Sequence, residues 1–208
     1  MPNMLSLHEL HVATGALVEE VCGWLLPVHY GDPVAEHRAV RKAAGLVDCS
    51  MVGRVEVTGR DRVSFLQGML TNDLKVLVPG QGCPAAFLDA HGKVHALLTV
   101  FVLEDRLLLE LPPGMTEKTL QTLDKFLISE KASFADVTDA FALFALHGPE
   151  AAVVLAKATG SAVSLPPYQH VERTVAAIPL RLCRVDELGV PGFHVWVASE
   201  HAANLWHS

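Results

Sequence analysis

Cysteine is scarce in this sequence of 208 residues, which contains only 4 of them. They lie far apart, at Cys22, Cys49, Cys83 and Cys183, and no Cys-x-x-Cys pair occurs. Disulfide-stapled secreted domains and zinc ribbons both need closely and regularly spaced cysteines. The sequence therefore argues against both, and it predicts free thiols buried in a core.

Basic residues are also few, with 16 Lys and Arg against 23 Asp and Glu and a formal charge of −7. Nucleic-acid-binding proteins usually present a dense basic surface to the phosphate backbone, and no dense basic run occurs here. We therefore expect no nucleic-acid partner.

Long hydrophobic runs are missing as well. The longest apolar stretches, residues 96–103 and 141–146, are much shorter than the roughly 20 residues that a membrane-spanning helix needs. The N-terminus lacks the basic and then apolar pattern of a secretory signal. We therefore expect no membrane partner and a cytoplasmic location.

Apolar residues make up 50% of the chain, which is enough for a sizeable core. Alternating or short apolar segments predict strands at residues 54–58, 85–88, 94–103, 107–111, 133–137, 141–147, 174–185 and 193–197. Helical spacing and capping residues predict helices at residues 34–44, 62–70, 116–128, 151–158 and 199–208. Helices interleaved with a largely antiparallel sheet predict an α+β fold with mainly antiparallel sheets and packed helices.

The order of these segments predicts three parts. Residues 1–50 form an N-terminal segment that packs on the core, residues 51–138 a first α+β module, and residues 139–208 a second one. The last segment starts a helix with a Ser199 cap, but the sequence stops after about two and a half turns. We therefore expect the second module to be incomplete and the C-terminal part of the fold to be missing.

Several spaced motifs resemble one family. Gly23-Trp-Leu-Leu-Pro-Val-His-Tyr-Gly31, Ala44-Gly-Leu-Val-Asp-Cys-Ser50 and His147-Gly-Pro-Glu150 are similar to the glycine-cleavage T-protein, a tetrahydrofolate-dependent aminomethyltransferase. Phe65-Leu-Gln-Gly68 and Phe87-Leu-Asp-Ala-His-Gly-Lys93 more closely resemble the YgfZ-type folate-binding proteins, which support iron–sulfur enzymes. The resemblance implies an aminomethyltransferase-like fold and tetrahydrofolate or a derivative as the ligand. It also implies a protein partner, either a lipoyl carrier or an iron–sulfur enzyme.

The chain departs from the T-protein where that family carries its chemistry. In the T-protein, the strand after a Gly-containing turn bears a pair of aspartates, and Ala96 and Leu97 stand in those places here. The family's late Gly-aromatic-Glu reads Gly192-Phe193-His194. A methyl or isobutyl group cannot give the electrostatic and proton-transfer assistance of a carboxylate. The catalytic residues are therefore unknown, and His95 and His194 are the candidate substitutes because imidazole titrates near neutral pH.

The resemblance also implies a ligand cavity lined mainly by apolar groups. Its expected lining residues are Val52, Pro84, Leu97, Thr99, Phe101, Glu187 and His194. Phe101 is suited to stacking against a flat heterocycle. Strand periodicity alone allows the alternative that Thr99 and Phe101 simply alternate into a core.

Other histidines give weaker signals. His91 and His95 are four apart and would share one face of a strand. A zinc site needs three or four ligands, so we expect no metal. His8 and His11 are three apart in a short helix and are expected on the surface.

The sequence thus predicts a tetrahydrofolate-binding protein that resembles the T-protein without its aspartate pair, with a YgfZ-type role in iron–sulfur maintenance as one form of this hypothesis. The alternative is an active folate-dependent aminomethyltransferase of the glycine cleavage system. A third hypothesis is a non-enzymatic scaffold that binds a protein through the apolar surface left open by the missing part. Whether the chain is an enzyme stays open at this point.

Overall fold

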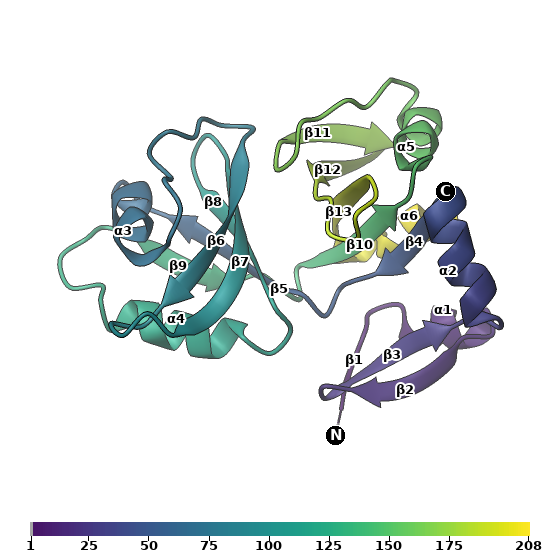
Figure 1. The fold of residues 1–208 in the computed structure, drawn as a ribbon, viewed down its shortest axis with the longest axis horizontal. Helices are drawn as coiled ribbons and strands as arrows, with labels where there is room; N and C mark the ends of the chain where they lie inside the picture. Colours follow the sequence, from purple (N-terminus) through teal and green to yellow (C-terminus); the bar gives the residue numbers. More distant parts are fainter. Residues whose placement is uncertain (1) are drawn as a thin grey trace. The chain divides into compact units, whose positions relative to one another are not determined.

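A computed structural model of the chain describes residues 2–208 and divides into two compact units (Figure 1). The first unit contains the N-terminal residues up to Met51 together with Ala140–Pro167 and Val171–Ser208. The second unit contains Val52–Asp139 and Tyr168–His170. The three-part division expected from the sequence stays a prediction beside this two-unit organisation.

The second unit is built on a five-stranded antiparallel sheet in the order β6-β7-β8-β5-β9. The strands are β5 (Gly53–Thr58), β6 (Gly82–Leu88), β7 (Val94–Val102), β8 (Leu107–Leu111) and β9 (Ser133–Asp136). Its helices are α3 (Arg62–Met69) and α4 (Thr116–Asp124) (Figure 1). One face of the sheet supplies a hydrophobic core that includes Val55, Leu98 and Val100. Because side chains alternate along a strand, the opposite face carries a different set of residues.

The first unit contains a five-stranded sheet in the order β11-β12-β13-β10-β4. Its strands are β4 (Gly45–Asp48), β10 (Phe141–His147), β11 (His170–Val175), β12 (Ile178–Arg184) and β13 (Gly192–Ala198). Two helices follow strands of this sheet, α5 (Ala151–Thr159) and α6 (Ala202–His207), the latter after a 3₁₀ turn at Ser199–His201. A second hydrophobic core that includes Phe144, Leu155, Phe193 and Ala202 covers one face of the sheet.

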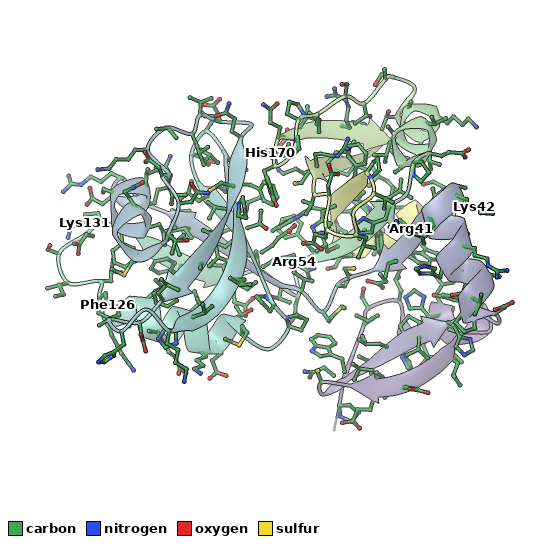
Figure 2. All side chains as sticks on the ribbon, in the orientation of Figure 1. Arg41, Lys42, Arg54, Phe126, Lys131 and His170 are labelled. Carbon is green, nitrogen blue, oxygen red and sulfur yellow. The ribbon has the colours of Figure 1, made fainter. Side chains whose placement is uncertain are left out.

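A small sheet of three strands begins the first unit, in the order β1-β3-β2. The strands are β1 (Asn3–Met4), β2 (Leu17–Val21) and β3 (Trp24–His29). Helix α1 (His8–Ala13) precedes β2, and α2 (Pro33–Lys42) follows β3. The Asp32 side chain caps α2 by accepting hydrogen bonds from the N–H groups of Val34 and Ala35. Arg41 and Lys42 lie at its C-terminal end, where positive charge is favoured by the helix dipole (Figure 2).

The α+β class and the mainly antiparallel sheets are confirmed, and the strand predicted at residues 141–147 is observed as β10. The single strand predicted at residues 174–185 is wrong, because β11 and β12 are separate strands. Ala176 and Ala177 connect them, and both have positive φ, at 48° and 68°. Two central residues with positive φ match the turn that joins two antiparallel strands directly.

The prediction that all four thiols are free and buried is only partly confirmed. All four cysteines are free, but Cys22 is exposed and Cys49 is half-buried. Cys83 and Cys183 are buried, and burial raises the pKa of Cys83 to about 11. None of the helices described in residues 2–208 has the length and apolarity needed to cross a membrane.

Candidate functional site

The outward face of β7 carries three of the expected ligand-lining residues. Leu97, Thr99 and Phe101 pair across β6 with Ala86, Pro84 and Gly82 respectively. Ala96 is 4% exposed and belongs to the hydrophobic core on the other face, whereas Leu97 is 63% exposed. Of the two places that the T-protein resemblance assigns to aspartates, only the place of Leu97 faces away from the core.

A polar row crosses the same face. Thr99 pairs with Glu110 of β8, and Glu110 pairs with Arg54 of β5. Arg54 is 1% exposed and Glu110 is 5% exposed, so this face buries two opposite charges on neighbouring strands. Figure 2 labels Arg54, whose guanidinium donates to the carbonyl oxygen of Thr138. The row gives the outward face of the sheet a polar character that its core face lacks.

Phe101 is the last of the three residues on this face of β7, and its ring is fully buried. It makes an edge-to-face contact with His170, with 5.6 Å between the ring centroids. The Nε2 atom of His170 lies 2.9 Å from the carbonyl oxygen of Val102, at the position labelled in Figure 2. The full burial of Phe101 is consistent with the alternative in which it alternates into a core, and its place in a ligand cavity stays a prediction.

The turn before β7 is held by Asp89. The Asp89 carboxylate accepts hydrogen bonds from the N–H groups of His91 at 2.8 Å and Lys93 at 2.9 Å. The bonds from Lys93 and then His91 hold the pKa of Asp89 below its usual range. His91 is therefore part of the turn and lies outside β7, so the expectation that it shares a strand face with His95 is wrong.

His95 is the extra residue of a β-bulge in the pairing of β6 and β7. Leu88 pairs with Val94 and Phe87 pairs with Ala96, which leaves His95 without an opposite residue. Its ring packs against Phe87, with 5.3 Å between the centroids. In residues 2–208, no three His, Cys, Asp or Glu side chains are grouped so that they could hold a metal ion.

A pair of buried histidines lies on β10 and β13 in the first unit. His147 is 4% exposed and His194 is 5% exposed, and their rings meet edge to face with 6.4 Å between centroids. His147 packs directly over Gly192, where a Cβ atom would overlap its Nδ1. Burial lowers the pKa of His147 and the neighbouring His194 lowers it further, while Asp186 acts in the opposite direction. His147 is therefore neutral near neutral pH.

Two acidic residues follow β12 beside these histidines. The Asp186 carboxylate accepts hydrogen bonds from the Arg184 guanidinium and from the N–H of Gly192 at 2.9 Å. Partial burial acts to raise the pKa of Asp186, but these bonds and the Arg184 charge outweigh it and hold the pKa below its usual value. The Glu187 carboxylate lies 3.9 Å from Nε2 of His194.

The prediction that His11 lies on the surface is wrong. His11 is fully buried, and its Nε2 lies 3.0 Å from the carboxylate of Asp48. Its Nδ1 lies 2.7 Å from the hydroxyl of Tyr30. The pKa of Tyr30 is raised by burial and then by the charges of Asp48 and Glu36. No local pattern predicts this network, because its members come from three separate segments.

The seven predicted lining residues fall in two groups. Val52, Pro84, Leu97, Thr99 and Phe101 belong to the second unit. Glu187 and His194 belong to the first unit, where they lie close together. Val52 is half-buried and directly precedes β5. Each group is a candidate binding surface in its own unit.

Comparison with known proteins identifies the family. The family model described as the GCVT N-terminal domain matches residues 7–208. This chain belongs to that family. An aminomethyltransferase of Chloroherpeton thalassium is 32% identical over 204 residues, which cover 97% of this chain and 56% of the relative. An aminomethyltransferase of Methylococcus capsulatus is 36% identical over 216 residues, which cover 99% of this chain and 57% of the relative.

Solved structures agree with the fold of a GCVT N-terminal domain. The glycine cleavage system aminomethyltransferase T of Bartonella henselae matches with a TM-score of 0.90 and 28% identity, over 100% of this chain and 56% of that chain. A chain of the heterotetrameric sarcosine oxidase of Corynebacterium sp. U-96 matches with a TM-score of 0.58 and 16% identity, over 84% of this chain and 89% of that chain, and shows the fold alone. This chain spans about half the length of the curated relatives it matches.

Proposed function

We propose that this chain binds tetrahydrofolate or a derivative of it, and that Leu97 and Thr99 contact the ligand. The observation that carries the proposal is the outward face of β7, where Leu97 is exposed beside half-buried Thr99. The T-protein resemblance puts a carboxylate at Leu97, close to the reacting nitrogen of folate. Membership of the GCVT N-terminal domain family supports the choice of ligand.

The same face argues against aminomethyl transfer by these residues. A carboxylate beside the accepting nitrogen assists transfer by its negative charge and by exchanging a proton. The isobutyl group of Leu97 offers neither, and the methyl group of Ala96 points into the core. We therefore propose binding without transfer, with a YgfZ-type role in maintaining an iron–sulfur enzyme and a cytoplasmic location as parts of the same proposal.

An active aminomethyltransferase is the second candidate. The identities of 32% and 36% to proteins of that name favour it. It would need a substitute acid or base. His194 suits this role better than His95, because the His95 ring lies in a β-bulge and packs against the ring of Phe87. Its protein partner would be a lipoyl carrier.

Titration with 5-formyltetrahydrofolate tests the first proposal. Binding is followed by the fluorescence of the three tryptophans, Trp24, Trp196 and Trp206, and is checked by calorimetry. We expect saturable binding by the chain. No binding by a folded chain would contradict the folate proposal. The resemblance to the T-protein would then reflect shared ancestry without a shared ligand.

An assay of ammonia release separates the two candidates. The aminomethylated lipoyl carrier and tetrahydrofolate are supplied with the chain, and we expect no release above the background reaction. Release would support the aminomethyltransferase instead. The variant Leu97→Asp restores one carboxylate of the family's aspartate pair, and release by this variant alone would support loss of the transfer step.

A further inference from the structure

The five-stranded sheet of the second unit has two edges, and they differ. The edge strand β6 is covered along its outer side, where Leu70 forms a bridge to Phe87 and Thr71 exchanges hydrogen bonds with the backbone of Ala86. The strand at the other edge is β9. The outer backbone groups of an edge strand are a template for pairing with a further strand. In this sheet, β9 is therefore the edge at which a strand from another chain can add.

The hydrogen bonds between β9 and β5 show which backbone groups of β9 face outward. Val137 N–H donates to Arg54 O at 2.9 Å, in the same register as the pairing of β9 with β5. Hydrogen-bonded and non-hydrogen-bonded pairs alternate along an antiparallel ladder, so the backbone groups of Ala135 point toward β5. The N–H and C=O groups of Phe134 and Asp136 consequently point away from β5, along the outer edge.

The side chains of β9 leave this edge accessible. Edge strands are commonly blunted by a lysine, a proline or a bulge. The four residues of β9 include neither Lys nor Pro, and their pairing with β5 is regular. Ser133 and Ala135 are small and exposed, and the one charged residue, Asp136, is the last of the strand.

The loop before β9 presents two large apolar side chains on an ordered backbone. Ile128 is 90% exposed and Phe126 is 51% exposed. The Glu130 carboxylate accepts hydrogen bonds from the N–H groups of Ile128 and of the next residue, at 3.2 and 3.0 Å. Lys131 N–H donates to the Asp61 carboxylate at 2.7 Å, and Figure 2 labels Phe126 and Lys131 in this segment. Exposed apolar side chains beside an accessible strand edge are typical of an interaction surface.

The charges around β9 suit pairing with a copy of itself. Lys131 precedes β9, whereas Asp136 ends it and Asp139 follows. A second β9 that pairs antiparallel runs in the opposite direction, so each Lys131 comes beside the acidic end of the other strand. Glu130 also precedes β9, but its bonds to the loop N–H groups turn its carboxylate back onto its own loop. The facing ends therefore carry opposite charges.

We propose that β9 pairs with β9 of a second copy of this chain, across a two-fold axis at Ala135. In this register Phe134 of each copy lies opposite Asp136 of the other, so all the outward N–H and C=O groups of these residues are paired. Ala135 lies opposite its own copy in a non-hydrogen-bonded pair, where side chains come closest and a small one fits. The two sheets become one continuous sheet, and the apolar loop before β9 lies beside the junction. The proposal is independent of folate binding.

Opposite charges placed at the two-fold axis test this proposal. Ala135 is exposed, so its own sheet has room for a longer side chain. Ala135→Lys and Ala135→Glu are studied separately, where each sets like charges face to face, and then as an equal mixture, where a Lys faces a Glu. Ala90→Lys is the matched control, because Ala90 is exposed in the turn before β7 in the same unit. Thermal melts confirm that each variant is folded.

Sedimentation velocity measures the mass of each sample over about 1 to 200 μM, a range that suits a small interface. We expect the original chain and Ala90→Lys to dimerise with the same Kd. Each Ala135 variant alone should have a Kd at least about 10-fold higher, because like charges are juxtaposed. The mixture should dimerise at least as well as the original chain.

Three results would overturn the proposal. A monomeric original chain throughout this range would exclude the second copy as the partner of β9. Dimers of Ala135→Lys as tight as those of the original chain would place the interface on another surface. A mixture as weakly associated as the separate variants would exclude pairing centred on residue 135.

Discussion

The Tyr30 hydroxyl and Nδ1 of His11 lie 2.7 Å apart, while Nε2 of the same ring lies 3.0 Å from the Asp48 carboxylate. The Asp48 carboxylate and the Tyr30 hydroxyl therefore engage both ring nitrogens of His11. The second Asp48 oxygen accepts from the N–H of Ser50 at 2.9 Å. These bonds link the end of the three-stranded sheet, α1 and β4 within one unit.

Removing the His11 ring should therefore destabilise the first unit. His11→Ala leaves the buried Asp48 carboxylate without its partner, and we expect the free energy of unfolding to fall by about 2–4 kcal/mol. Urea unfolding measures the change. His37→Ala is the control, because His37 is exposed on α2 and should change stability by less than about 0.5 kcal/mol. Equal effects of the two variants would contradict a role for the network.

Aspartate should be tolerated at residue 97 but not at residue 96. Leu97 is exposed, so Leu97→Asp should cost less than about 1 kcal/mol, as expected for a polar residue on a strand surface. Ala96 belongs to the core, so Ala96→Asp buries an unpaired polar group and should cost about 3 kcal/mol. Urea unfolding of the two variants makes the comparison. A larger loss at residue 97 would contradict the assigned faces of β7.

Two glycines should respond oppositely to alanine. A Cβ at Gly192 would overlap the Val185 carbonyl oxygen and the His147 ring, so Gly192→Ala should destabilise the chain by about 1–3 kcal/mol. Gly68 lies in α3 with no atom near the place of its Cβ, so Gly68→Ala should stabilise by about 0.5–1 kcal/mol. Thermal unfolding monitored by circular dichroism compares both variants with the original chain.

Lowering the pH should reduce the free energy of unfolding, because His147 must be protonated. Its pKa is lowered in the folded state, so the unfolded chain binds a proton first as the pH falls below about 6.5. Stability is therefore fully present above that pH and decreases below it, by at most about 1.4 kcal/mol per pH unit for one proton, until the lower folded pKa is reached. His147→Gln should show a flatter dependence between about pH 7.5 and 5.5.

Urea unfolding at several pH values measures this slope for both chains. His37→Gln is the control, because it makes the same substitution at a histidine that is exposed on α2 in the same unit. An unchanged slope in His147→Gln would show that another group causes the acid sensitivity.

Local patterns predicted many of the elements. The alternating segment at residues 54–58 is part of β5, and the apolar segment at residues 141–147 is β10. Both strands were predictable because the periodicity of a strand depends only on residues adjacent in sequence. Strands β2, β3 and β4 were not predicted. They bury few side chains, and β2 and β3 bury none, so their sequence lacks the strong apolar alternation of a core strand.

The amino-acid sequence by itself determined the family and the α+β class, because motifs and composition belong to the chain. That Ala96 and Leu97 replace an aspartate pair stays a prediction from the resemblance. Only the tertiary structure decided that Ala96 faces the core while Leu97 faces outward, that Glu187 lies beside His194, and that His11 is buried between Tyr30 and Asp48. The physical reason is that burial and contact depend on strand register and on segments distant in sequence, which no local pattern specifies.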